Sequence, residues 1–401
     1  MTQRQGLESG HPFPNCYTPE LLVLSRGRGV WLEDRAGKRY LDFAGGIAVN
    51  ALGYGRRDLA RIACAQMKRL PHVSNLFASE PALELARRMA ASGGFQAVQF
   101  LNSGSEANET ALKYARLYAS RKKGAGCARL LCFSGGFHGR TMGALSVTPT
   151  PKYQEPFQPL IPEVEVGIYN DAEDLERRLG PRFAGVIVEV IQGEGGLETM
   201  SPEFASALNR LCRDHDVILI ADEVQTGLSR TGTFYAGQAV GLKPDIITLA
   251  KPLAGGLPLA AALLPEKVNS LIHVGEHGTT FGGGPVTTAV GLRVWKILSQ
   301  RAFIERVRAR GELLRRLLEE LKARHPGLGE VRGRGLLQGI AVPAAGAAGE
   351  RMPELLAALR EEGLLALRSG LNILRLAPPL VISEAEIRRG MKILSRVLAR
   401  F

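Results

Sequence analysis

The stretch that decides the fold is residues 217–227, which read VILIADEVQTG. Five apolar residues in a row, without alternation, predict a strand that is buried on both faces. Asp222 follows directly, and a carboxylate at the end of a buried strand is costly unless it has a cationic partner. A protonated pyridine nitrogen would be such a partner. From this stretch alone, a metal-binding or capping carboxylate is an equally good interpretation.

Four more apolar runs predict further strands of the same sheet. They are residues 97–101 (AVQFL), 130–133 (LLCF), 185–188 (GVIV) and 246–250 (IITLA). Helical patterns separate the runs, which is typical of an α/β fold with a mostly parallel sheet between helices. Ligands of such sheets bind at the carboxyl ends of the strands, so we expect the chemistry in the residues that follow each run.

Lys251 ends the run at residues 246–250. Lysines are rarely fully buried unless they are paired. Removing an amine from water lowers its pKa and makes it a nucleophile toward aldehydes. The alternative is a lysine whose ammonium reaches the surface while its methylenes stay buried.

Two other strand ends carry small residues and an aromatic ring. Residues 102–108 (NSGSEAN) join a turn to a helix start, where free N–H groups can bind an anion, although an ordinary N-capped turn is the simpler interpretation. In residues 134–140 (SGGFHGR), Phe137 could lie flat against a planar ring and Arg140 could grip a carboxylate. A glycine-rich surface loop is the alternative there. Together the strand ends supply the parts that pyridoxal 5′-phosphate needs.

Composition restricts the partners. The chain has 401 residues, 45% of them hydrophobic, and a net charge of +12, from 51 Lys and Arg against 39 Asp and Glu. The basic residues are dispersed, and the densest run, Arg121-Lys122-Lys123, is interpreted as a solvated helix end. We therefore expect anionic small molecules as partners, and neither nucleic acid nor a membrane.

Cysteine usage and the chain start point to the cytoplasm. The five cysteines are odd in number and none has Cys-x-x-Cys spacing, so neither a disulfide framework nor a metal site is expected. No apolar run of about 18 residues occurs, and the first residues lead to no signal-peptide core.

The organisation predicts two domains. Residues 1–50 form an arm and part of a small domain, residues 51–284 a large domain, and residues 285–401 the rest of a small α+β domain. Two β-like runs at 30–34 and 39–43 around a glycine turn predict a hairpin, and residues 285–325 predict one long helical stretch.

In their order along the chain, these motifs resemble those of the class III pyridoxal-phosphate-dependent aminotransferases, from about Tyr17 to the C-terminus. The likeness is carried by Lys251 and by residues 42–49 (DFAGGIAV), 72–77 (HVSNLF), 102–108 (NSGSEAN), 137–140 (FHGR), 192–196 (QGEGG), 222–225 (DEVQ), 277–283 (HGTTFGG) and 375–380 (RLAPPL). The resemblance implies the type I transferase fold, with a large domain around a mostly parallel sheet and a smaller α+β domain.

The resemblance also implies the roles of the cofactor-binding residues. Lys251 would bond to the cofactor aldehyde and later carry a proton, and Asp222 would pair with the pyridine nitrogen. Phe137 would stack on the ring and Gln225 would contact its phenolic oxygen. The others in the matching motifs are Gly104 and Ser105 for the phosphate, Glu223 and Val224 beside Asp222, and Thr280 for the phosphate in the partner subunit of a homodimer with shared active sites.

The substrate residues implied are two arginines and their neighbours. Arg140 would bind a substrate carboxylate with Thr279 nearby. Arg375 would bind the α-carboxylate of glutamate or 2-oxoglutarate, and Glu194 would pair with Arg375 until that substrate arrives. A switchable pair lets one pocket accept either a neutral side chain or a second carboxylate.

The activity implied is transfer of an amino group from N2-acetylornithine to 2-oxoglutarate, as in arginine biosynthesis. The same chemistry on succinylornithine, ornithine, 4-aminobutyrate or the carrier-bound aminoadipate semialdehyde of lysine biosynthesis stays open, as does an aminomutase. A binding module that lost its chemistry is disfavoured by the joint presence of Lys251, Asp222 and Gln225. Two departures from the family pattern, residues 52–57 (LGYGRR) and 283–285 (GGP), leave the substrate and the interface open.

Overall fold

The computed structural model describes residues 16, 22–124, 126–342 and 351–400. Its centre is a seven-stranded sheet in the order β4-β10-β9-β8-β7-β5-β6. These strands are β4 (Ala97–Leu101), β5 (Arg129–Phe133), β6 (Val164–Gly167), β7 (Phe183–Glu189), β8 (Ile218–Asp222), β9 (Ile246–Leu249) and β10 (Ala260–Leu264). All five expected strands are present, and the α/β fold with a mostly parallel sheet is confirmed.

Two strands of the sheet were not expected. β6 is short and lies at the sheet edge, where a half-exposed VEVG segment gives only a weak pattern. β10 reads AAALL, a composition that favours a helix, yet it pairs antiparallel with both β4 and β9. Tertiary pairing therefore overrides local propensity at β10.

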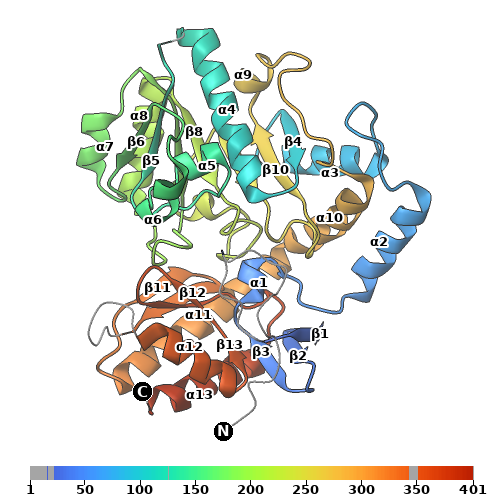
Figure 1. Ribbon diagram of the computed structural model, residues 1–401, viewed down its shortest axis with the longest axis vertical. Helices are drawn as coiled ribbons and strands as arrows, with labels where there is room; N and C mark the ends of the chain where they lie inside the picture. The colour runs from blue at the N-terminus through green and yellow to red at the C-terminus, as the bar shows by residue number, and fades with distance from the viewer. Residues whose placement is uncertain (1–15, 17–21, 125, 343–350, 401) are drawn as a thin grey trace.

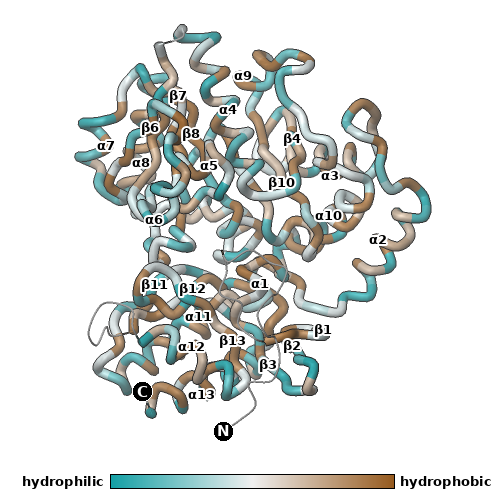
Figure 2. The backbone as a smooth tube through the Cα atoms, viewed as in Figure 1, coloured by the Kyte–Doolittle hydropathy of each residue, from teal (hydrophilic) through white to brown (hydrophobic). Residues whose placement is uncertain are grey.

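Helices cover both faces of the sheet (Figure 1). Alternate residues of β7 face different layers: Val186 packs in the cluster that contains Leu208 of α8, and Ile187 in the cluster that contains Ala115 of α4. This two-sided burial explains the unbroken apolar runs, and the strands are correspondingly brown in Figure 2. The helices of this part are α1 (Gly45–Ala48), α2 (Arg57–Arg69), α3 (Glu80–Ala91), α4 (Gly104–Lys123), α5 (Met142–Ser146), α6 (Pro151–Gln154), α7 (Ala172–Arg178), α8 (Pro202–Asp214) and α9 (Glu266–Asn269), with the short 3₁₀ turns η1 (Glu155–Phe157) and η2 (Ala236–Ala239).

The ends of the chain build two smaller sheets. The expected hairpin is β2 (Trp31–Asp34) and β3 (Arg39–Asp42), preceded by β1 (Leu24–Arg28), and β3 pairs in parallel with β13 (Leu364–Leu365). The other sheet has the order β11-β12-β15-β14. Its strands are β11 (Val331–Arg334), β12 (Leu337–Ala341), β14 (Leu367–Ser369) and β15 (Ile373–Leu376). The helices α12 (Arg351–Glu361) and α13 (Glu384–Leu398) pack on β13, in the sheet that contains the hairpin. The domain boundaries at residues 50 and 284 stay predictions.

The prediction of one long helical stretch at residues 285–325 is wrong in one respect. It consists of two helices, α10 (Pro285–Leu298) and α11 (Arg301–Arg324), because the backbone turns extended at Gln300. α10 packs on α2 and α3, whereas α11 packs on α13 and β12. The polar Ser299-Gln300 pair separates helices that serve different parts of the fold.

The basic run at residues 121–123 does end a helix, α4, but it is not simply solvated. The Lys123 ammonium donates to three backbone carbonyls, those of Phe183, His215 and Asp216, at 2.9 to 3.2 Å. Arg121 pairs with Glu276. Within the described residues, no helix combines the length and the apolarity needed to cross a bilayer.

Candidate active site

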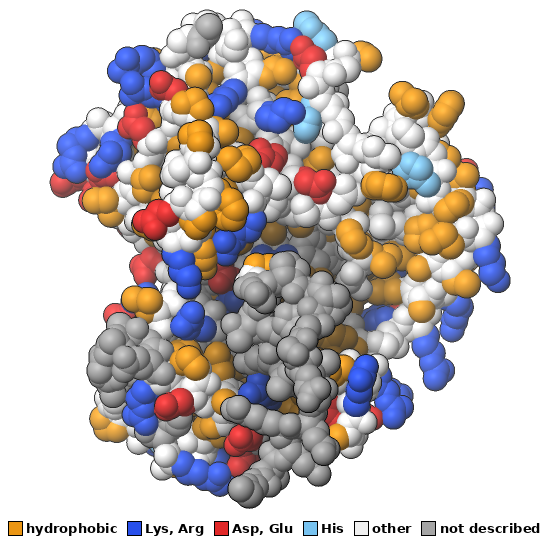
Figure 3. Space-filling model, viewed as in Figure 1, with side chains coloured by type: hydrophobic (Ala, Val, Ile, Leu, Met, Phe, Trp, Pro, Cys, Tyr) orange, Lys and Arg blue, Asp and Glu red, His pale blue; other side chains and the backbone are white. Residues whose placement is uncertain are grey.

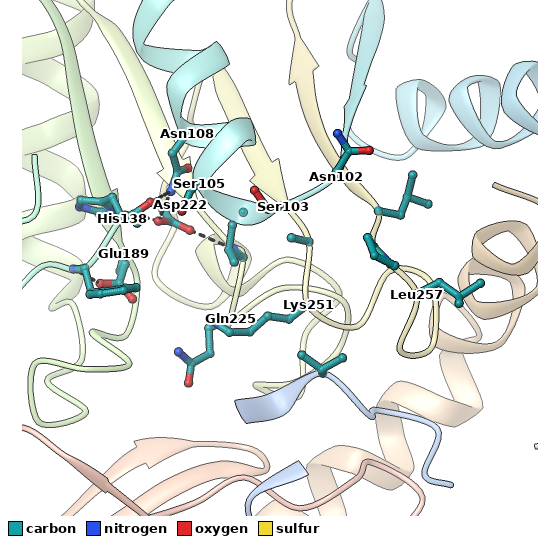
Figure 4. A pocket seen from close by; sticks show the side chains of 18 of the residues that line it. Asn102, Ser103, Ser105, Asn108, His138, Glu189, Asp222, Gln225, Lys251 and Leu257 are labelled. Atoms are coloured by element: carbon teal, nitrogen blue, oxygen red, sulfur yellow. Dashed lines mark hydrogen bonds and ion pairs between the residues drawn. The ribbon is translucent and has the colours of Figure 1, made fainter. Parts of the chain in front are cut away.

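A cavity of about 340 Å³ lies at the carboxyl ends of the central strands (Figure 4). Its lining comes from the residues that follow β4, β5, β8 and β9 and from Glu189, the last residue of β7. Seven of the expected cofactor residues line it: Gly104, Ser105, Phe137, Asp222, Val224, Gln225 and Lys251. The sheet therefore gathers at one edge the groups that the sequence spreads over some 150 residues.

Asp222 is buried at the end of β8 and held by three neighbours. Its Oδ2 accepts a hydrogen bond from the Asn108 amide at 2.8 Å and lies 2.8 Å from Nδ1 of His138. Its Oδ1 accepts from the Val224 backbone N–H at 3.0 Å. The cluster is visible in Figure 4. The sequence analysis assigned a role to neither His138 nor Asn108, yet both contact the carboxylate and orient it.

Lys251 lies two residues after the end of β9 and lines the cavity. Among the described residues, its ammonium makes no hydrogen bond and no ion pair. Burial lowers the pKa of Lys251, although the charges of Asp222, Glu189 and Glu194 act in the opposite direction. A partly buried amine with a lowered pKa is suited to bond with an aldehyde.

The start of α4 forms a turn suited to an anion on another side of the cavity. Ser103 caps the helix: its Oγ accepts from Glu106 N at 3.3 Å, and Glu106 accepts from Ser103 N at 2.7 Å. This leaves the N–H groups of Gly104 and Ser105 without an acceptor among the described residues. Gly104 has no room for a side chain, because a Cβ would lie 2.6 Å from the Val224 side chain. Such a turn suits a phosphate.

Glu189 is a buried carboxylate that the sequence analysis missed. Its two oxygens accept from the backbone N–H groups of Phe137, at 2.9 Å, and Gly193, at 3.1 Å. Burial raises the pKa of Glu189 to about 7, and the nearby charge of Asp222 adds to the rise. The signal was present, since Glu189 follows a buried apolar run just as Asp222 does.

The structure brings Glu194 and Arg375 together. Nη1 of Arg375 lies 2.5 Å from Oε1 of Glu194, 2.6 Å from the Gly193 carbonyl oxygen and 3.4 Å from Oε1 of Gln225. Arg375 belongs to β15, so the pair joins the C-terminal sheet to the cavity loops. The Nε atom of Arg375 is buried and has no partner among the described residues.

Six expected residues lie outside the cavity lining: Glu223, Thr279, Thr280, Arg140, Glu194 and Arg375. The Glu223 carboxylate accepts from the backbone N–H groups of Ala236 and Gly237, at 2.7 and 2.9 Å, so it holds a loop. Thr279 accepts from Asn75 through its carbonyl oxygen and from Asn102 through its hydroxyl. Thr280 is exposed to solvent.

Comparison with known proteins gives consistent results. A family model described as aminotransferase class-III matches residues 13–398. A probable mitochondrial acetylornithine aminotransferase of Dictyostelium discoideum is 42% identical over 94% of this chain and 84% of its own length. A succinylornithine transaminase of Yersinia pseudotuberculosis is 41% identical over 94% and 92%. The crystal structure of the ornithine aminotransferase from Toxoplasma gondii superimposes with a TM-score of 0.92 at 31% identity, covering 96% of this chain and 92% of that one.

Class III aminotransferases use pyridoxal 5′-phosphate, and the cavity fits that group. The unpaired Lys251 amine suits its aldehyde, and the free N–H groups at the start of α4 suit its phosphate. Asp222, fixed by Asn108 and His138, suits a protonated ring nitrogen.

Replacing Lys251 by alanine is expected to abolish covalent attachment of the cofactor, because no other lysine among the described residues lines the cavity. After loading and borohydride reduction, mass spectrometry should find the cofactor on residue 251 of the wild type and on no residue of Lys251→Ala. Lys243→Ala, at an exposed lysine, is the matched control and should label normally. Cofactor attached to a different lysine of the wild type would contradict the assignment.

Replacing Glu189 by glutamine is expected to change how stability depends on pH. The pKa of Glu189 is raised from 4.5 to about 7, so the folded state binds a proton that the unfolded state has lost. The contribution of this proton to the free energy of unfolding is complete below pH ~4.5 and is lost as the pH rises through 7. The free energy of unfolding of the cofactor-free protein, measured by urea titration between pH 5 and 8, should therefore fall less steeply with pH in the variant. The difference in slope should be at most about 1.4 kcal/mol per pH unit.

Asp174→Asn is the control for that measurement. Ion pairing with Arg178 lowers the pKa of Asp174 to about 2, so its stabilising effect is lost only in acid. The variant should be less stable than the wild type at every pH from 5 to 8, with an unchanged slope. An unchanged slope in Glu189→Gln as well would contradict a raised pKa at Glu189.

Proposed function

Because this chain belongs to the class III aminotransferases, a family that uses pyridoxal 5′-phosphate, we propose that it transfers the amino group of N2-acetylornithine to 2-oxoglutarate. The products are N-acetylglutamate 5-semialdehyde and glutamate. The observation that carries the proposal is the unequal state of two arginines near one cavity. Arg375 is neutralised by Glu194, whereas Arg140 has no ion pair among the described residues.

The reaction takes place in two halves at the same cavity. The bound cofactor supplies an electrophilic carbon for the amino group and a ring that stores electrons. Lys251 would hold the cofactor through that carbon until the amino substrate takes its place. Its Nζ, whose pKa burial lowers, would then carry the proton that leaves the substrate carbon. Asp222 would keep the ring nitrogen protonated, in the orientation that Asn108 and His138 impose.

The two arginines account for two different acids. In acetylornithine, the carboxylate lies far from the reacting amine, and Arg140, with Thr279 nearby, would bind it. Glu194 then screens Arg375 from the uncharged part of this substrate. Glutamate carries a carboxylate beside its amine, which would displace Glu194 and take Arg375. Glu194 is the partner able to move, since its side chain is 35% exposed and that of Arg375 only 4%.

The relatives support an acylated ornithine as the substrate class. Those described above are named acetylornithine aminotransferase and succinylornithine transaminase, at nearly the same identity to this chain. The two substrates share the ornithine carboxylate and δ-amine and differ only in the acyl group. The proposal takes the acetyl form and makes the succinyl form part of its test.

A homodimer with shared sites remains part of the proposal. The loop before α3 and the segment next to Thr280 expose large apolar side chains, with Leu76 86% exposed, Phe77 74% and Phe281 68%. Orange side chains gather over the region of α2 and α3 in Figure 3. Exposed apolar patches of this kind mark interfaces, and Thr280 beside Phe281 would there face a partner's cofactor. We further propose a cytoplasmic location, although the Dictyostelium relative is named as mitochondrial.

A panel of amino donors tests the substrate. In single-turnover experiments, each donor is mixed with the cofactor-loaded protein and the loss of visible absorbance is followed. N2-acetylornithine should react fastest: all four donors carry a carboxylate far from the reacting amine, but succinylornithine adds a second carboxylate, ornithine adds a charged α-amine, and 4-aminobutyrate has a shorter chain. A rate with acetylornithine no higher than with 4-aminobutyrate would show the substrate to be wrong.

Glu194→Gln separates the two half-reactions. A glutamine cannot neutralise Arg375, so the arginine stays available for an α-carboxylate. The specificity constant for glutamate should rise or hold, while that for acetylornithine should fall roughly tenfold, about 1.4 kcal/mol, because an unpaired charge then faces an uncharged chain. Glu198→Gln, on the same loop and paired with Arg332, is the matched control and should affect the two substrates equally. Equal losses in Glu194→Gln would rule out a switching role.

A further inference from the structure

Arg140 lies with one face against an aromatic ring that no motif of the sequence analysis includes. Its Cζ is 3.5 Å from the centre of the Tyr153 ring and 5.5 Å from that of Phe137. The two rings are nearly perpendicular, at 86°, with their centres 6.4 Å apart. The guanidinium is therefore held in an aromatic corner directly beside the cavity residues 137–139.

The backbone of Arg140 is fixed as well. Its N–H donates to the Ser105 hydroxyl at 3.3 Å, on the turn that starts α4. Gly139 makes this approach possible: its φ is +138°, and a Cβ there would lie 2.2 Å from Ser105 Oγ. The base of the arginine side chain is thus tied to the turn that starts α4, and among the described residues only the two rings hold its far end.

An arginine held by its face keeps its donors free. The five N–H groups of a guanidinium lie in its plane and point outward from its edges, whereas cation–π contact uses the face. Arg140 is exposed and makes no ion pair among the described residues, so without the rings its long side chain would sample many rotamers. A carboxylate could then bind only after selecting one of them.

Tyr153 is itself well anchored. It belongs to the single turn α6, where its N–H donates to the Thr150 carbonyl oxygen at 2.8 Å. The next residue, Gln154, donates to the carbonyl oxygens of Leu145 and Ser146 at 3.0 and 3.3 Å, which ties the turn to α5. The Tyr153 hydroxyl has no hydrogen-bond partner among the described residues, so the ring and not the hydroxyl makes the contact.

We propose that Tyr153 is a positioning residue that presets Arg140 for the carboxylate lying farthest from the reacting amine. Tyr153 thereby helps to select substrates with such a carboxylate, which acylated ornithine and glutamate have and alanine lacks. This inference rests on the proposed function, because it assumes that Arg140 is the group that binds the distal carboxylate.

The test compares two amino donors on cofactor-loaded variants. In single-turnover reactions, Tyr153→Leu should raise the half-saturating concentration of glutamate about 3- to 30-fold, the range expected for losing a cation–π contact. The maximal rate should change little. L-Alanine, which has only the carboxylate bound by Arg375, should react as with the wild type. Tyr153→Phe keeps the ring and should restore glutamate binding to within about twofold.

Controls exclude a merely structural effect. Phe157→Leu removes an exposed aromatic ring from the same segment, one with no arginine over it among the described residues, and should leave both donors unchanged. In an Arg140→Ala background, Tyr153→Leu should have no further effect on glutamate. Calorimetric titration with glutarate, a dicarboxylate without an amine, should show the same 3- to 30-fold loss of affinity in Tyr153→Leu. If the leucine variant does not fold, Tyr153→Met takes its place.

Two results would overturn the proposal. One is an equal loss for alanine and glutamate in Tyr153→Leu. The other is an effect of Tyr153→Leu that persists without Arg140. Failure of acetylornithine to react with the wild type would instead overturn the proposed substrate, and the comparison of glutamate with alanine would still decide the role of Tyr153.

Discussion

The site depends on an amine that the fold keeps partly out of water without giving it a partner. Lys251 lies two residues after the end of β9, a fully buried strand, and its side chain lines the cavity. Three carboxylates lie near enough to raise its pKa, yet burial outweighs them and the net shift is downward. Were any of them in contact with the amine, it would remain a bound ammonium and lose its nucleophilic character. Each carboxylate is instead engaged elsewhere.

The hydrogen bonds of these carboxylates connect the parts of the site. Asp222 is held by Asn108 and His138, on the side of α4 and of the loop after β5. Glu189 joins that loop, at Phe137, to the glycine loop that carries Glu194. A displacement of Glu194 by a substrate would therefore act on a loop whose other anchor holds the residue proposed to stack on the ring.

The arginine half of the site requires the C-terminal sheet to lie against the loops of the central sheet. Arg375 comes from the C-terminal sheet, and its partner Glu194 from a loop of the large sheet. Arg230, fully buried between them, donates to the carbonyl oxygens of Leu336 and Pro378 and so fixes one part against the other. Burial lowers the pKa of Arg230 to about 9. The geometry of the Glu194–Arg375 ion pair therefore depends on how these two parts of the fold pack against each other.

The sequence by itself determined the strands that are buried on both faces, their order as α/β units and the residues at their ends, because a continuous apolar run and the polar residue that stops it are local features. Motif spacing also named Arg375 and Glu194, though only by resemblance. Tertiary structure alone decided that β10, an alanine-rich segment, is an antiparallel strand, and that residues 285–325 form two helices. It alone revealed Glu189 as a carboxylate with a raised pKa, and Tyr153 as the ring beneath Arg140. Burial, pKa and stacking depend on neighbours that are distant along the chain, and no local pattern specifies them.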